Sequence, residues 1–326
     1  MAHPAAGPVR RGASVCRVKI RSLASIAALA ALALTSCSSE TTAPTAAQTP
    51  RDWAAHIQGI AAASGEKAFS QLDLVGPMVT LTYLADGSVM NGAGNEPGRF
   101  EYRVYDDYQD TRAFKPLSDF NLDAFAKALT AQEKACGDKQ VTGRITLTHT
   151  GAALQRLGCE ATTTKADIAS TTLAGSAMKE LPALVSAQAL DTVLAEARAM
   201  HGDDLASLAL AKATDSDTAH AVVTAAPRKN SSGSAVCAQT STRWATPGTK
   251  GLLAEYADCA AETPGKGSIK ASSVTGAQLM ALIDKAAAKL KTAPAELDTV
   301  LVTPGKTPGS ITVSATAGKQ SATVSS

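Results

Sequence analysis

Four segments with the period of an amphipathic helix are each followed by residues that alternate between apolar and polar, and this rhythm limits the chain to a mixed fold. The helical segments lie near residues 53–64, 122–129, 190–197 and 279–290. Thr275 and Gln278 begin the last one with the spacing of a capping box, and Ser186 is placed to cap the third. Alternating runs occupy residues 78–89, 99–107, 143–151, 205–213, 220–226, 297–305 and 309–324. Each helix therefore precedes a small antiparallel meander.

The fold class that this rhythm predicts is α+β, with two tandem domains that each pack helices on one face of a small antiparallel sheet. We expect the first domain at residues 52–165 and the second at residues 186–326. The segment 166–185 between them begins with many threonine and alanine residues. We expect this segment to be a linker, and a strand and turn is the alternative.

The amino-terminal segment is typical of a secretion signal. Residues 1–22 include five basic residues and no acidic one, and an apolar run from Leu23 to Leu34 follows. The run is shorter than the roughly 20 apolar residues that a membrane-spanning helix needs. It ends in the sequence LTSC at residues 34–37, a leucine and two small residues before a cysteine.

This ending resembles the lipobox of bacterial lipoprotein precursors of the actinobacterial type. The resemblance covers residues 17–37 and implies that residues 1–36 are removed and that the thiol of Cys37 is diacylated. Two acyl chains hold a protein stably on a membrane, so it also implies lipid anchoring on the extracytoplasmic face of the cell membrane. Residues 37–51, rich in Ser, Thr, Ala and Pro, are then a disordered tether. The alternative is an ordinary secretion signal beside a chance cysteine.

The mature chain is close to neutral, which excludes a nucleic-acid surface as the main feature. The precursor carries 31 basic and 29 acidic residues, a net charge of +2. Five of the basic residues precede Cys37, so their removal leaves 26 basic residues against 29 acidic ones and a charge of about −3.

Four cysteines follow the lipobox and fall into two pairs, Cys136 with Cys159 and Cys237 with Cys259. The two spacings are nearly the same, 23 and 22 residues. An even number of cysteines in an exported protein indicates disulfides, and four cysteines allow three connectivities. The matched spacings favour one bridge within each pair. A zinc site built from all four thiolates is the alternative, but it lacks the usual close cysteine spacing.

The sequence contains no motif for an enzyme, a metal or a cofactor. The five histidines lack the spacing of zinc-binding motifs, and no serine-hydrolase elbow or phosphate-binding loop occurs. We therefore expect a protein that is not an enzyme and that needs no cofactor.

A tyrosine- and aspartate-rich segment is the candidate contact patch for a partner. It contains Tyr102, Tyr105, Asp106, Asp107 and Tyr108. Exposed tyrosines anchor many protein interfaces. The alternative is a strand end that runs into a solvated turn.

These observations predict a membrane-anchored binding or scaffold module of the cell envelope. Its partners are the membrane, through the lipid anchor, and another envelope protein, a polymer or a lipid. The alternative is a carrier of a lipid or small apolar ligand, with a cavity between helices and sheet. A hydrolase whose residues are scattered along the chain is the third hypothesis.

Overall fold

The structure, a computed structural model, describes residues 51–104, 112–160, 166–214, 218–229, 236–246, 252–261 and 267–326. Residues 1–50, which include Cys37, lie outside this part of the chain. Within the described ranges, no helix is long and apolar enough to cross a membrane.

The chain has the α+β architecture that the sequence predicts, in two sheet-bearing regions of one unit, Thr49–Ser326. In the first region, each of two helices precedes a meander of strands. The elements are α1 (Trp53–Ser64), β1 (Phe69–Val75), β2 (Met78–Ala85), β3 (Ser88–Gly94), β4 (Glu101–Val104), the 3-10 turn Leu117–Phe120, α2 (Leu122–Cys136), β5 (Val141–Leu147), β6 (Ala153–Glu160), β7 (Ala166–Leu173) and β8 (Ser176–Ala177).

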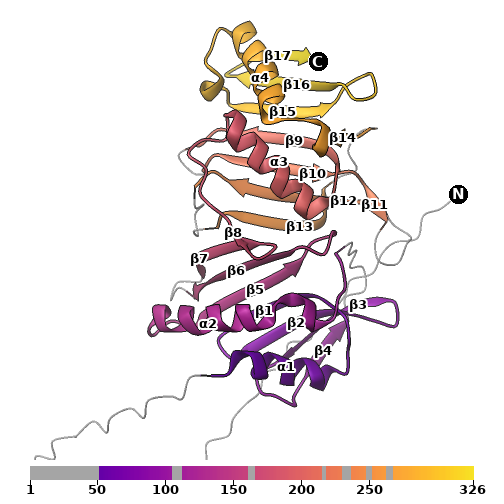
Figure 1. Ribbon diagram of the computed structural model, residues 1–326, viewed down its shortest axis with the longest axis vertical. Helices are drawn as coiled ribbons and strands as arrows, with labels where there is room; N and C mark the ends of the chain where they lie inside the picture. The colour runs from indigo at the N-terminus through magenta and orange to yellow at the C-terminus, as the bar shows by residue number, and fades with distance from the viewer. Residues whose placement is uncertain are drawn as a thin grey trace, which may run out of the picture. The chain divides into compact units, whose positions relative to one another are not determined.

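The two meanders of this region join into one antiparallel sheet in the order β4-β3-β2-β1-β5-β6-β7-β8. The joint lies between the first strands of the two meanders, because β1 pairs with β5 from Gln71 opposite Thr146 to Val75 opposite Thr142. Figure 1 shows α1 and α2 on one face of this sheet.

The second region repeats the arrangement. Its elements are α3 (Ala187–His201), β9 (Asp204–Ala211), β10 (His220–Ala225), β11 (Arg228–Lys229), β12 (Val236–Trp244), β13 (Ala254–Ala261), β14 (Ile269–Lys270), the 3-10 turn Ala271–Ser273, α4 (Gly276–Leu290), the 3-10 turn Pro294–Glu296, β15 (Thr299–Pro304), β16 (Ile311–Ala317) and β17 (Gln320–Ser325). Here β9 pairs with β15 and joins the two meanders, while β13 pairs with β12 at one edge.

The predicted helix starts are confirmed. The Ser186 side chain accepts a hydrogen bond from Ala189 N at the start of α3. Thr275 and Gln278 form both bonds of a capping box at the start of α4. These bonds satisfy backbone N–H groups that have no partner within the helix, so they define where each helix begins.

The helices of the first region bury their apolar stripes against the sheet. Trp53, Ile57 and Ile60 of α1 are fully buried at helical spacing. Helix α2 comes close to β5 at Gly143. A Cβ atom at this position would lie only 2.9 Å from Cζ of Phe125 in the helix. The missing side chain of Gly143 therefore makes room for the helix.

Cys136, the last residue of α2, forms a disulfide with Cys159 of β6, the pairing that the spacing favours. The bond fastens the helix to the sheet that it covers. The other predicted pair, Cys237 and Cys259, lies on the adjacent antiparallel strands β12 and β13. The side chains of this second pair are outside the description, so their pairing stays a prediction.

The linker expected at residues 166–185 is not found over residues 166–177, where the alternative, a strand and a turn, is confirmed. Residues 166–177 form β7 and β8, and β7 pairs with β6, with Leu173 opposite Leu154. Threonine is β-branched and favours strands, so a threonine-rich run next to an open sheet edge becomes a strand rather than a linker.

Candidate functional site

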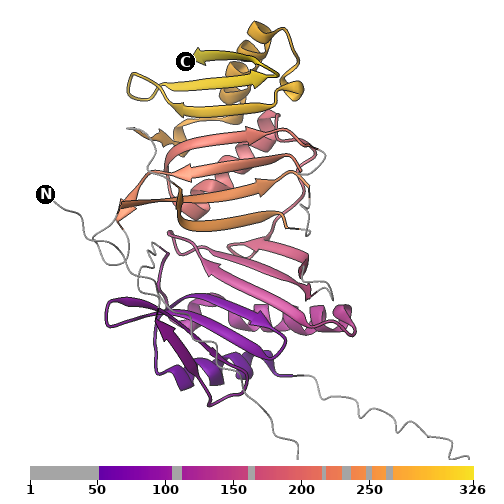
Figure 2. The ribbon, with the colours of Figure 1, turned by 180° about the vertical axis from the view of Figure 1, so that it is seen from behind.

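The face of the first sheet that carries no helix holds a set of polar side chains. On β1, Leu72 and Leu74 are buried on the helix side, so the alternation of the strand turns Gln71 and Asp73 to the other side. Figure 2 shows this second face of the sheet without a helix in front of it. We call it the open face of the first sheet.

Strand register places polar residues of four strands in one line across the open face. Asn91 of β3 lies opposite Thr82 of β2, which lies opposite Gln71 of β1. Gln71 lies in turn opposite Thr146 of β5. Because cross-strand partners share a face, the sheet itself brings these four side chains together.

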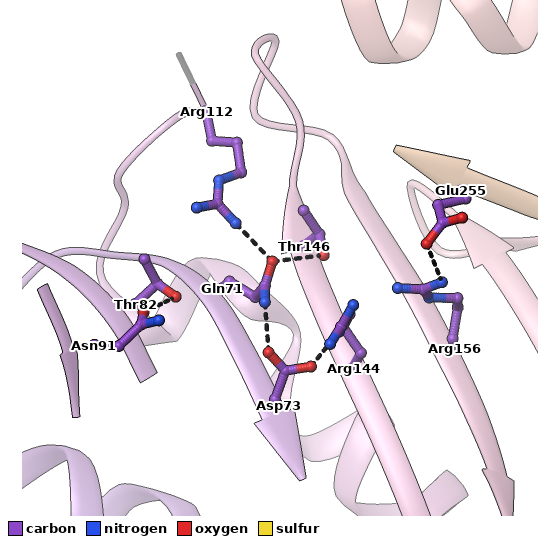
Figure 3. A network of polar contacts seen from close by, with 9 residues as sticks. All are labelled: Gln71, Asp73, Thr82, Asn91, Arg112, Arg144, Thr146, Arg156 and Glu255. Carbon is purple, nitrogen blue, oxygen red and sulfur yellow. Dashed lines mark hydrogen bonds and ion pairs between the residues drawn. The ribbon is translucent and has the colours of Figure 1, made fainter. Parts of the chain in front are cut away.

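Hydrogen bonds fix the side chains of this line (Figure 3). Thr82 Oγ1 donates to Asn91 Oδ1 at 2.5 Å. Gln71 Oε1 accepts from Arg112 Nη1 at 2.6 Å and from Thr146 Oγ1 at 3.2 Å. The Gln71 amide then donates to Asp73, which links this line to a charged row beside it.

The charged row crosses β1, β5 and β6. Asp73 lies opposite Arg144, and Arg144 lies opposite Arg156. Asp73 accepts a hydrogen bond from Arg144 Nε. Arg156 Nη1 lies 3.5 Å from Oε1 of Glu255, which comes from β13 (Figure 3). The row therefore places two guanidinium groups side by side with a carboxylate at each end.

Burial changes the electrostatics of the row. The Arg156 side chain is only 11% exposed. This burial lowers the pKa of the Arg156 guanidinium, and the charge of Arg144 lowers it further, while Glu255 and Asp73 act in the opposite direction. An arginine nevertheless keeps its charge at neutral pH, so the site holds a positive charge that is largely removed from water.

A hollow of about 350 Å³ lies beside the charged row. Arg144, Arg156 and Thr142 contribute to its wall, together with apolar residues that include Ile168 and Leu252. The hydroxyl oxygen of Thr142 is buried and has no hydrogen-bond partner among the described residues. The hollow thus offers guanidinium donors and an apolar wall within one small volume, and the buried hydroxyl belongs to a residue of its wall.

The structure does not test the sequence-predicted contact patch. Tyr102 lies in β4, but its side chain is not described. Tyr105, Asp106, Asp107 and Tyr108 lie outside the described residues, as does Cys37. Sequence reasoning missed Arg144 and Arg156. The alternation over residues 143–151 predicts a strand that contains Arg144, but no local pattern indicates that Arg156 lies opposite Arg144 on the next strand.

A histidine–serine contact occurs elsewhere, in the second region. His201 Nε2 lies 2.8 Å from Ser241 Oγ. Both side chains are buried, at 0% and 2% exposure, so a substrate cannot reach them. Among the described residues, no group of three or more histidine, cysteine or acidic side chains could hold a metal ion.

Comparisons with known proteins give no family. No family model matches the sequence, and no curated protein matches it. Among solved structures, a PCNA2–PCNA3 complex from Sulfolobus tokodaii is 12% identical and covers 83% of this chain and 94% of its own, with a TM-score of 0.16. Proliferating Cellular Nuclear Antigen from Entamoeba histolytica is 13% identical over 81% of this chain and 91% of its own, with a TM-score of 0.14. These likenesses are too weak to support an argument about fold or function.

Proposed function

We propose that this protein is a membrane-anchored binding module of the cell envelope and that it is not an enzyme. The resemblance of the LTSC sequence to a lipobox supports an anchor at Cys37 on the extracytoplasmic face. The tether at 37–51 then holds the two sheet-bearing regions near the membrane surface, where they contact an envelope protein, a polymer or a lipid.

The observation that carries the proposal is the charged row beside its hollow on the open face of the first sheet. Asp73, Arg144, Arg156 and Glu255 are held by strand register and by their mutual contacts rather than by flexible loops. Groups fixed in this way suit recognition, because little conformational entropy is lost when a ligand binds. The His201–Ser241 pair, whose chemistry is closest to that of a hydrolase, is sealed inside the protein.

A retention experiment tests this function. The full-length protein, purified in a neutral detergent and immobilised, is incubated with solubilised envelope proteins and with fragmented envelope polysaccharide. We expect it to retain a component that the double variant Arg144→Gln/Arg156→Gln loses. Lys212→Gln is the matched control, because the Lys212 and Arg144 side chains are both 42% exposed and both form an ion pair. Equal retention by wild type and double variant contradicts a binding role for this face.

A carrier of a small apolar ligand is the second candidate, and one observation favours it. A hollow of about 340 Å³ lies between the segment Pro182–Val185 and the ends of β9 and β15. Its lining includes Leu184, Leu210 and Val300. Titration with a radiolabelled fatty acid distinguishes this candidate, because Val185→Lys, at a partly buried position of the wall, should abolish saturable uptake into this hollow while leaving the retention experiment unchanged.

A further inference from the structure

We propose that the hollow beside Arg144 and Arg156 binds the carboxylate of an acidic sugar, whose hydroxyl groups bond to the neighbouring acidic side chains. This inference rests on the proposed function, because it names the ligand class for the same face of the first sheet. It is carried by four features of the hollow: the pairing of two like charges, their unused donors, a buried hydroxyl and the net charge of the wall.

The first feature is the cross-strand pairing of Arg144 with Arg156. Like charges directly opposite one another destabilise a sheet, so a ligand of opposite charge placed between them removes a repulsion. Arg156 gains most from such a ligand, because its guanidinium is largely buried and is repelled by Arg144.

The second feature is the number of donors that remain unused. A guanidinium group has five N–H donors. Arg144 uses its Nε for Asp73, and Arg156 directs Nη1 at Glu255 across 3.5 Å, the upper limit for a hydrogen bond. Neither guanidinium has another hydrogen-bond or ion-pair partner within the described part of the chain. Both can therefore present N–H groups to an oxyanion.

The third feature, independent of the arginines, is the buried hydroxyl of Thr142 in the wall of the hollow. Thr142 precedes Arg144 by two residues on β5, so both side chains point to the open face. A buried hydroxyl without a partner is unfavourable. Rotation about χ1 exchanges the hydroxyl with the methyl group, so that a ligand oxygen in the hollow would give this hydroxyl the partner that the described residues do not supply.

The fourth feature decides between kinds of anion. Asp73 and Glu255 balance the charges of Arg144 and Arg156, so the four side chains together are neutral. A doubly charged phosphate would be repelled by both carboxylates, whereas a carboxylate carries one charge and matches the guanidinium fork. The two acidic side chains then accept hydrogen bonds from hydroxyl groups of the same ligand.

The apolar residues of the wall and the volume of the hollow suit a sugar ring. Val75, Ile168 and Leu252 provide apolar surface for the C–H groups of the ring. The volume of about 350 Å³ lies at the lower end of the range for small-molecule sites, which suits a sugar unit, either free or at the exposed end of a polymer.

The test is an isothermal titration calorimetry series on the full-length protein in neutral detergent, which measures the affinity of each probe directly. The probes are D-glucuronate, an oligogalacturonate, D-glucose and inorganic phosphate. We expect saturable binding of D-glucuronate, no binding of D-glucose and weaker binding of phosphate. The oligogalacturonate distinguishes a polymer from a free sugar acid as the source of the carboxylate, because only a site open at one side accepts the longer probe.

Two variants test whether glucuronate binds in this hollow. Arg144→Gln should weaken glucuronate binding about tenfold or more, through loss of a charge-assisted hydrogen bond, while Lys212→Gln leaves it unchanged. Thr142→Val keeps the shape of the side chain and removes the hydroxyl. It should melt no earlier than wild type yet bind glucuronate several-fold more weakly, which separates ligand binding from folding.

The possible results have distinct meanings. Phosphate binding as tight as glucuronate binding overturns the assignment of a sugar acid, as does equal glucuronate affinity in wild type and Arg144→Gln. If no probe binds but the double variant still loses an envelope component in the retention experiment, this inference fails and the proposed function stands. If neither experiment distinguishes the variants, both proposals fail.

Discussion

His201 Nε2 lies 2.8 Å from Ser241 Oγ and ties the end of α3 to β12. The His201 ring also stacks on Tyr256 of β13, with 5.4 Å between ring centroids. Arg228 donates to the backbone carbonyl of His201 from one side and contacts the ring of His149 with its other terminal nitrogen at 2.6 Å. A neutral histidine is thus enclosed between strands and next to a permanent positive charge.

This arrangement predicts that stability falls in mild acid. Burial lowers the pKa of His201 to about 4, and the charges of Arg228 and His149 add to the effect, while a hydrogen bond with Gln239 opposes it. Below the unfolded pKa of about 6.5, the unfolded chain takes up a proton that the native chain does not. The contribution of His201 to the free energy of unfolding is therefore complete above pH 6.5 and is lost progressively between pH 6.5 and about pH 4. The total loss is on the order of 3 kcal/mol.

Urea denaturation at a series of pH values measures this dependence. The free energy of unfolding of His201→Gln should change less between pH 6.5 and 4 than that of wild type, whatever the absolute stability of the variant. His220→Gln is the control, because it replaces a half-buried histidine of β10 in the same sheet and keeps the buried His201 ring. Parallel curves for wild type and His201→Gln would show that the buried ring does not set the slope.

The Cys136–Cys159 disulfide predicts a second stability effect. The bridge closes a loop of 23 residues and holds the end of α2 on β6. The double variant Cys136→Ala/Cys159→Ala should lose about 3 kcal/mol of unfolding free energy, because the unfolded chain regains the entropy of the open loop. Guanidinium denaturation without reductant measures the loss. A further loss when reductant is added to this variant would reveal the predicted Cys237–Cys259 bridge, and an unchanged stability in the double variant contradicts the prediction.

A side chain at position 143 should disturb the packing of α2 on β5. A Cβ atom at this position would lie 2.9 Å from Phe125 Cζ and 3.0 Å from Leu129 Cδ2, closer than side chains normally allow. Gly143→Ala should therefore push α2 from the sheet and cost about 1–3 kcal/mol, the usual range for overpacking. Thermal unfolding measures the loss. Ala209→Val is the control, because Ala209 alternates with the buried Leu208 and Leu210 and lies on the opposite side of its strand.

The parts of the fold that the sequence predicted are those determined locally. The capping box at Thr275 and Gln278 spans four residues, and helical and strand periods are visible within ten or so. The sequence did not predict the pairing of β1 with β5, which brings Asp73 to Arg144 across 71 residues of chain. Register across that distance depends on the whole sheet, so the charged row could not be assembled from the sequence alone. The linker expected at 166–185 is a strand over residues 166–173 for the same reason, because pairing with β6 decides the structure of this segment.

The membrane anchor gives the last prediction. If the LTSC sequence at 34–37 is a lipobox, replacing Cys37 removes the thiol that carries the acyl chains, and the protein can no longer be held stably on the membrane. In cell fractionation, the Cys37→Ala variant should then be found in the soluble extracytoplasmic fraction or the medium instead of the membrane fraction. Cys16→Ala is the matched control, since Cys16 lies upstream of the predicted cleavage point and should leave the protein membrane-bound. Retention of Cys37→Ala in the membrane fraction to the wild-type extent means that the lipobox interpretation is incorrect, and with it the tethered arrangement.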